Sequence, residues 1–144
     1  MKHLIIIGLI FLHLVARAQN EPLVVITNKK GAPEEMKMTE LRSIMMGERQ
    51  RWKDGNKIRI ALMKPSTQTG ISTCKKIYDK DGDEVKKFWL GLVFQGKADA
   101  PVFFNSEAEL KTFVSENEGA IGIVEIFVNT PDIKMVSIDG KREF

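Results

Sequence analysis

Apolar residues follow two spacings along the chain, and these spacings predict strands and helices in alternation. Continuous or alternating apolar runs predict strands at residues 22–27, 57–63, 120–124 and 134–138. Apolar residues three and four apart predict helices at 39–46, after residue 70, from about 84 to 95, and after Ser106. The order β, α, β, α, α, α, β, β predicts an α/β domain with a mainly parallel or mixed sheet.

The helix that ends near Gln95 carries the clearest apolar stripe. Its members occupy positions i, i+3, i+4, i+7 and i+8, and they are Val85, Phe88, Trp89, Leu92 and Val93. Ser106 and Glu109 form a capping box for the next helix. Glycines 47, 96 and 119 follow three of the helical patterns and predict where these helices end.

The first eighteen residues have the organisation of a secretory signal peptide. Lys2 and His3 precede an apolar run, and Ala16-Arg17-Ala18 has the small-x-small pattern of a signal-peptidase site. We expect cleavage after Ala18, leaving one domain over residues 19–144 in the periplasm or outside the cell. The alternative is an N-terminal anchor that stays attached.

Removal of that segment changes the composition of the chain. Lys+Arg falls from 22 to 20 (22 − 2) against an unchanged 19 Asp+Glu, so the net charge falls to +1. No basic patch stands out, which argues against nucleic acid as a partner. Both histidines are also removed, which excludes Ser-His-Asp and Cys-His catalysis and histidine-based zinc sites. Carboxylate or lysine chemistry remains as an alternative, but no pair of carboxylates forms a recognisable signature, so we expect a protein that is not an enzyme and has no cofactor.

A hydroxyl-rich segment between a predicted strand and a predicted helix is the main candidate site. Lys64-Pro-Ser-Thr-Gln-Thr-Gly70 and Ser72 offer hydroxyl donors, and Gly70 lets backbone N–H groups approach a ligand closely. Together with the N–H groups of a helix start, these are the ingredients of an oxyanion site. The alternative is that the hydroxyls only cap the helix. Lys64 steers an anion in the first case and is simply solvated in the second.

Three further features have simpler interpretations. Asp79, Asp81 and Asp83 have the spacing of a calcium loop, but Glu84 stands at the position that requires glycine, so we expect a turn into a helix and no metal site. Cys74 shares an apolar face with Ile71 and Ile77, which predicts an inert buried thiol, with an intermolecular disulfide as the alternative. The aromatic residues in segments predicted as loops either cover the core edge or line a cleft, and they are Trp52, Phe103 and Phe104.

Four segments together resemble a known family. They are Met38–Ile58, Ala61–Gly70, Lys86–Lys97 and Asn117–Glu125, and their order and spacing resemble the substrate-binding proteins of phosphate ABC transporters. These belong to the periplasmic binding protein class with type 2 topology. The resemblance implies a central mixed sheet flanked by helices, and the length of the chain suits a single lobe of such a protein.

The same resemblance implies a ligand. Its family holds phosphate in the loop that corresponds to residues 64–70, which places Ser66, Thr67, Thr69 and Gly70 near the anion-binding positions. Lys64-Pro65 stands where the family has Arg-Ser, so the bidentate arginine clamp is missing. The acidic residue of the family's loop is missing as well.

Two functions are therefore expected as alternatives. The first is weak binding of inorganic phosphate or a similar oxyanion by an exported, non-enzymatic domain, through Lys64, Ser66, Thr67, Thr69, Gly70 and Ser72. The second is a protein–protein interaction module with a degenerate ligand site, which docks on a membrane transporter, on a sensor protein or on a second copy. The sequence leaves the oligomeric state open.

Overall fold

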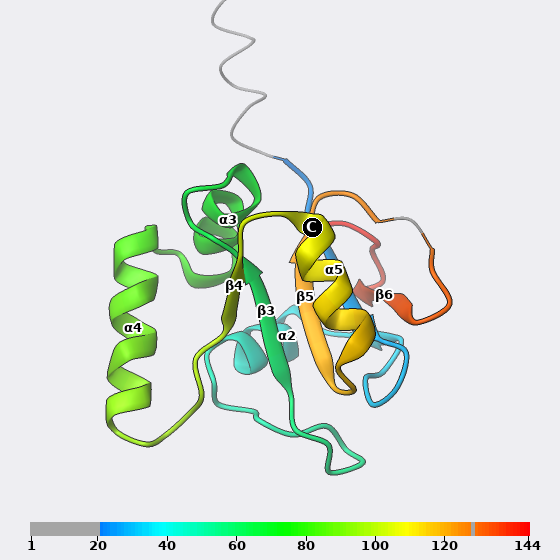
Figure 1. Ribbon diagram of the computed structural model, residues 1–144, viewed down its shortest axis with the longest axis horizontal. Helices are drawn as coiled ribbons and strands as arrows, with labels where there is room; N and C mark the ends of the chain where they lie inside the picture. The colour runs from blue at the N-terminus through cyan, green and yellow to red at the C-terminus, as the bar shows by residue number, and fades with distance from the viewer. Residues whose placement is uncertain (1–20, 128) are drawn as a thin grey trace, which may run out of the picture.

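The computed structural model describes residues 21–127 and 129–144, so the predicted signal peptide lies outside the described residues. One mixed sheet of six strands forms the centre of the molecule (Figure 1). The elements in chain order are β1 Val24–Asn28, β2 Glu35–Met36, α2 Met38–Met45, β3 Arg59–Met63, α3 Gln68–Thr73, the π-helix η1 Cys74–Tyr78, α4 Gly82–Phe94, β4 Val102–Phe104, α5 Glu107–Glu116, β5 Ala120–Val124 and β6 Ile133–Ile138.

The strands lie in the order β2-β6-β1-β5-β3-β4. Strand β3 runs parallel to both β4 and β5, whereas β1 is antiparallel to β5 and β6. Because β3, β4 and β5 are parallel, their carboxyl ends meet at one edge of the sheet. The mixed sheet flanked by helices confirms the fold class predicted from the sequence.

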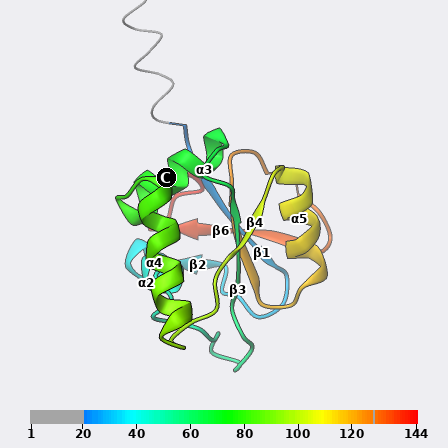
Figure 2. The same cartoon turned by 60° about the vertical axis from the view of Figure 1, so that its left-hand side comes forward.

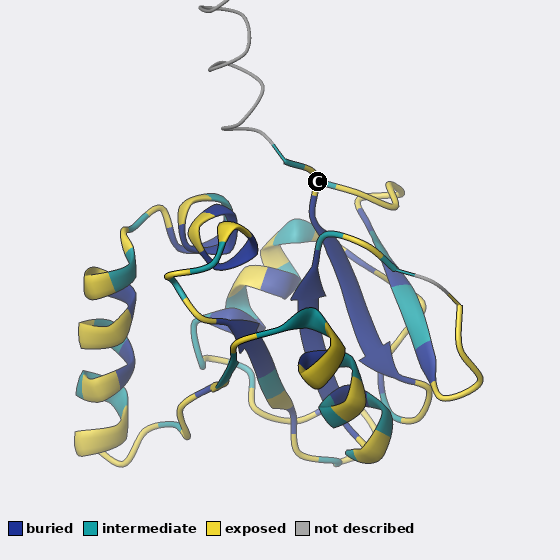
Figure 3. Cartoon of the chain, turned by 45° about the horizontal axis from the view of Figure 1, so that its top comes forward, coloured by how far each residue is buried: buried dark blue, intermediate teal, exposed yellow. Residues whose placement is uncertain are grey.

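Helices cover both faces of the sheet, and alternate residues of β1 pack on opposite faces. Val25 packs in a core cluster with residues of α2, η1 and α4, whereas Val24 and Ile26 pack in a second cluster with Leu110 and Val114 of α5. Helices α4 and α5 lie on opposite sides of the sheet (Figure 2). All five residues of β1 are therefore buried, and so are all five residues of β5 (Figure 3).

The predicted strands at 22–27, 57–63, 120–124 and 134–138 are all present with small shifts of their ends. Strands β2 and β4 were not predicted, because two and three residues are too few to show a periodic pattern. Strand β4 contains Phe103 and Phe104, which were expected in a loop, and it pairs with β3 at the end of the strand order.

The helix after β3 differs from its prediction in two ways. It begins at Gln68 rather than after Gly70, and it continues as the π-helix η1. A π-turn holds more residues than an α-turn, which shifts the buried face along the chain. Cys74, Ile77 and Tyr78 are buried as expected, but Ile71 is 51% exposed, so its predicted place on the apolar face was wrong.

The stripe predicted for α4 is only partly buried. Val85 and Trp89 lie in the core, whereas Val93 is 44% exposed, so the prediction was wrong for Val93. Leu90 and Phe94, one turn apart, are 56% and 86% exposed. Within the described part of the chain, no helix combines the length and the apolar character that a membrane crossing requires.

Candidate functional site

The predicted oxyanion loop lies at the carboxyl end of β3. Met63 ends this strand, and the loop from Lys64 to Thr67 leads into α3. The ends of β4 and β5 lie at the same edge of the sheet, since both strands are parallel to β3. Ligands of open α/β sheets bind outside the carboxyl ends of strands, so the loop occupies a favourable place in the fold.

Thr67 caps α3 and also closes the loop on itself. Its Oγ1 accepts a hydrogen bond of 3.0 Å from the backbone N–H of Gly70 and donates one of 2.7 Å to the carbonyl of Lys64. Its own backbone N–H donates to the same carbonyl at 2.9 Å. The Thr67 hydroxyl therefore caps the helix, which is the alternative weighed from the sequence.

Gly70 is required by the packing of its own chain. A Cβ atom at this position would lie 1.9 Å from the carbonyl oxygen of Lys64 and 2.9 Å from that of Met63. The sequence suggested that Gly70 lets the backbone approach a ligand closely. In the structure, Gly70 instead lets α3 approach the end of β3. Gly70 and Ser72 are both buried.

Thr69 is buried and points to a residue that sequence analysis missed. Its Oγ1 donates a hydrogen bond of 3.1 Å to Oε1 of Glu107, in the first turn of α5. The same carboxylate oxygen accepts a hydrogen bond of 2.7 Å from the backbone N–H of Glu125, directly after β5. Glu107 therefore ties together the segments that follow β3 and β5.

The carboxylate of Glu107 consequently lies close to the predicted anion loop. Oε2 of Glu107 pairs with Lys111 at 3.7 Å, one turn along α5. Oε1 of Glu125 is buried and has no hydrogen-bond partner among the described residues. No local motif marked Glu107 as a partner of Thr69, because 38 positions separate them and only the parallel strands bring them together.

Lys64 and Ser66 are the exposed members of the predicted site. The side chains of both residues make no hydrogen bond or ion pair with other residues in the described ranges 21–127 and 129–144. The structure therefore divides the predicted set. Lys64 and Ser66 face solvent, Thr67 caps the helix, and Thr69, Gly70 and Ser72 are buried behind them.

The acidic segment that precedes α4 forms a helix cap, as the sequence predicted. Oδ1 of Asp81 accepts a hydrogen bond of 2.9 Å from the backbone N–H of Glu84. In turn, Oε1 of Glu84 accepts a hydrogen bond from the backbone N–H of Asp81. The bond from the Glu84 backbone is the main cause that lowers the pKa of Asp81. Among residues 21–127 and 129–144, no group of three or more His, Cys, Asp or Glu side chains is placed to hold a metal ion.

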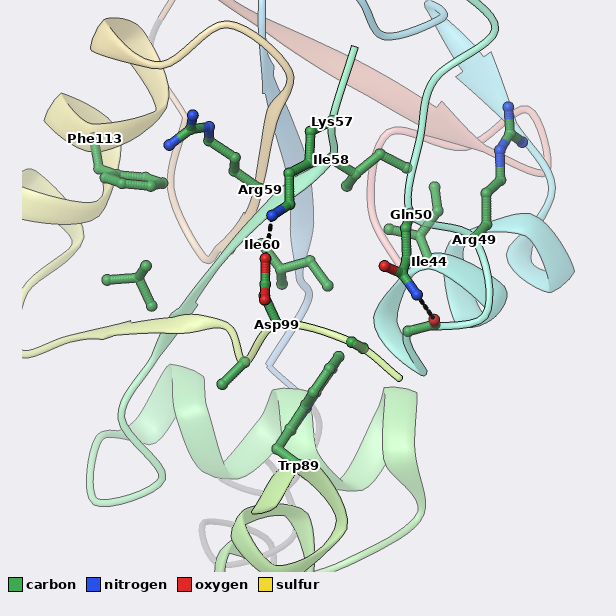
Figure 4. Close-up of a pocket in the computed structure, with 14 residues that line it drawn as sticks. Ile44, Arg49, Gln50, Lys57, Ile58, Arg59, Ile60, Trp89, Asp99 and Phe113 are labelled. Carbon is green, nitrogen blue, oxygen red and sulfur yellow. Dashed lines mark hydrogen bonds and ion pairs between the residues drawn. The ribbon is translucent and has the colours of Figure 1, made fainter. Parts of the chain in front are cut away.

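A cavity of about 250 Å³ lies at the opposite end of β3, and sequence analysis did not find it (Figure 4). It is lined by residues of α2, α4, α5, the start of β3 and the segment before β4. The polar lining residues are Arg49, Gln50, Lys57, Arg59 and Asp99, and the larger apolar ones are Ile44, Ile58, Ile60, Trp89, Val102 and Phe113.

Comparison with solved structures finds the same fold in phosphate-transport proteins. A structure of an ABC-type phosphate transport receptor from Vibrio cholerae matches with a TM-score of 0.64 and 18% identity, over 85% of this chain and 48% of the receptor. A protein from Clostridium perfringens, described as a phosphate ABC transporter substrate-binding protein with bound phosphate, matches with a TM-score of 0.64 and 16% identity, over 83% of this chain and 46% of the other.

PstS from Borrelia burgdorferi matches with a TM-score of 0.61 and 16% identity, over 83% of this chain and 48% of PstS. No protein-family model matches the sequence. No curated protein matches it either. The resemblance drawn from the four sequence segments is thus confirmed for the fold, and the chain spans about half the length of these three structures.

Proposed function

We propose that this chain is an exported, non-enzymatic solute-binding domain that binds a phosphate-like oxyanion weakly at the loop between β3 and α3. The observation that carries this proposal is the position of Lys64 and Ser66. Both side chains are exposed, without partners among the described residues, at the carboxyl edge of three parallel strands. The structures that share this fold include a substrate-binding protein with bound phosphate from Clostridium perfringens.

Thr67 and Thr69 contribute to binding only if their present hydrogen bonds rearrange. The Thr67 hydroxyl is engaged with the N–H of Gly70 and the carbonyl of Lys64, and the Thr69 hydroxyl is engaged with Glu107. An anion that recruits either hydroxyl must replace a hydrogen bond that already exists, so the net gain is small. Weak binding follows from this exchange.

The carboxylate of Glu107 also lowers the affinity for anions. It lies 3.1 Å from the Thr69 hydroxyl and is 21% exposed, so water screens its charge only in part. Lys64 supplies the opposing positive charge from the exposed side of the loop. The expected binding is therefore in the millimolar range and strongly dependent on salt.

Isothermal titration calorimetry with phosphate and with sulfate at low ionic strength tests this function. Ser66→Ala and Thr69→Ala are the informative variants, because both remove a hydroxyl from the loop. Ser115→Ala is the matched control, since its hydroxyl lies at the other end of α5 and donates a hydrogen bond to the carbonyl of Thr112. Heat that disappears in the two loop variants and persists in the control supports the proposal. An absence of heat at millimolar anion overturns it.

A second candidate function is docking on another protein, and the exposed apolar face of α4 favours it. Leu90, Val93 and Phe94 share one face of this helix and are each more than 40% exposed. A transporter, a sensor protein or a second copy of the chain would cover this face. The oxyanion loop would then be a remnant of the fold without a ligand of its own.

Sedimentation velocity and crosslinking of the purified chain test docking between copies. Phe94→Ser removes the most exposed apolar side chain, and Lys97→Ser is a control beyond the end of the helix. A dimer that Phe94→Ser abolishes supports this function. A strictly monomeric chain that also crosslinks to no co-expressed membrane protein counts against it.

A further inference from the structure

We propose that the cavity at the amino end of β3 binds a small organic carboxylate with a compact apolar body, such as an aryl-substituted acetate. This cavity lies at the opposite end of β3 from the oxyanion loop, and the two share no residue. The inference is therefore independent of the proposed phosphate site. It rests on the charge balance of the cavity rim and on the apolar residues behind it.

Arg59 is the cation available to a ligand. Lys57 pairs with Asp99 across the cavity, and Arg49 pairs with Glu40 at 3.5 Å. The Arg59 guanidinium makes no hydrogen bond or ion pair within the described parts of the chain. It extends from β3 on the side of the cavity where Phe113 lies (Figure 4). A planar guanidinium binds a carboxylate with two parallel hydrogen bonds, which selects for this group.

The rim of the cavity is electropositive even with its internal ion pair. Three lining residues carry a positive charge, and Asp99 carries the one negative charge. The pairing with Lys57 lowers the pKa of Asp99, so its carboxylate stays ionised and neutralises Lys57 rather than Arg59. Because Lys57 and Arg49 are already paired, an anion with a single negative charge matches the guanidinium of Arg59.

The interior of the cavity is apolar and suits an organic body rather than an inorganic ion. Ile60, Val102 and Phe113 leave apolar surface open to the cavity, and the buried side chains of Ile44, Ile58 and Trp89 lie behind them. Trp89 reaches into this region from α4 and Phe113 reaches it from α5 (Figure 4). The volume of about 250 Å³ exceeds the ~150 Å³ of an engineered apolar cavity that binds benzene, so one ring fits.

Protein-detected NMR titration with phenylacetate tests the site on the full chain. We expect shifts in the amide signals of residues 57–60 and 98–100, which line the cavity. Two related compounds separate the contribution of the negative charge from that of the aromatic ring. Acetate keeps the charge without the ring, and phenylacetamide keeps the ring without the charge. Each should bind about tenfold more weakly than phenylacetate.

Arg59→Gln is the decisive variant, because it removes the charge from an exposed side chain without disturbing the core. It should weaken phenylacetate binding about tenfold, as expected for one charge-assisted interaction. Arg142→Gln is the matched control, since Arg142 is exposed and lies outside the cavity. Ala98→Leu adds bulk to the lining and should abolish binding in a folded chain.

Three results of the phenylacetate titrations would overturn the inference. They are an absence of shifts at millimolar phenylacetate, shifts confined to residues outside the cavity, and equal binding by the Arg59→Gln and Arg142→Gln variants. Competition by phosphate at equal concentration would also contradict it, because an inorganic ion gains nothing from the apolar interior.

Discussion

Thr69 and Glu107 are joined by a hydrogen bond of 3.1 Å between the hydroxyl of one and the carboxylate of the other. Thr69 follows β3 and Glu107 follows β4, so the bond links two segments that parallel strands bring to one edge of the sheet. A hydroxyl expected to hold an anion is thus engaged with an acidic side chain. This hydroxyl can therefore reach another acceptor only if its hydrogen bond to Glu107 is replaced.

Glu107→Gln should strengthen phosphate binding at the loop about fivefold at low salt, because it removes a negative charge from the site. The amide oxygen of glutamine still accepts the hydrogen bonds from Thr69 and from the backbone of Glu125. Glu109→Gln is the control, since it changes the net charge equally from an exposed position on the same helix. Calorimetry with phosphate measures the effect. Equal affinity of the two variants would show that Glu107 does not act on the anion.

Gly70→Ala should destabilise the chain by about 3 kcal/mol, because its Cβ would collide with the carbonyl oxygen of Lys64 at 1.9 Å. Gly91→Ala provides the opposite case in the same fold. Nothing lies within 4 Å of a Cβ atom at Gly91 in α4, so alanine should stabilise the chain by about 1 kcal/mol. Urea denaturation of both variants measures the difference. A stable Gly70→Ala variant would contradict the close packing of α3 on β3.

The single tyrosine of the chain should titrate only at strongly alkaline pH. Tyr78 is buried, donates a hydrogen bond of 2.8 Å to the carbonyl of Met45 and accepts one of 3.2 Å from the indole of Trp89. Burial raises the pKa of Tyr78, and this effect outweighs the opposing effect of the Trp89 hydrogen bond. An absorbance titration of tyrosinate measures this pKa directly.

The same shift makes stability depend on pH in a defined direction. The unfolded chain loses the phenolic proton near the ordinary pKa of about 10, whereas the folded chain retains it. The stabilisation is complete below that pH and is lost progressively as the pH rises above it. Denaturation at increasing alkaline pH should show the loss, and Tyr78→Phe should remove this part of the dependence. Tyrosinate that forms near pH 10 in a folded chain would contradict the prediction.

The thiol of Cys74 should be unreactive while the chain is folded. The side chain is buried, and its burial is the largest cause that raises the pKa, with Asp81 acting in the same direction and Lys86 against it. Because the thiolate is the reactive form, iodoacetamide should modify Cys74 slowly in buffer and rapidly in denaturant. Mass spectrometry follows the reaction. Equal rates in the two conditions would show that the thiol is accessible in the folded chain.

The sequence by itself determined most of the elements and the fold class. Apolar periodicity located β1, β3, β5 and β6, because a strand buried on both faces or in alternation leaves a continuous or two-residue pattern. It also placed the α5 cap at Ser106 and the buried thiol at Cys74, because caps and helical faces are set by neighbours along the chain. Four ordered segments were sufficient to indicate a fold that distant structures share.

Only the tertiary structure decided what surrounds the candidate sites. The partnership of Thr69 with Glu107 depends on the parallel pairing of β3 with β4 and β5, and no spacing in the sequence records it. The π-helix that follows α3 was not visible in the sequence, and the cavity beside Arg59 is lined by residues of α2, α4, α5 and β3 that are distant in sequence. These features arise from contacts between segments that are distant in sequence, whereas periodicity reports only the local backbone and the face that each element buries.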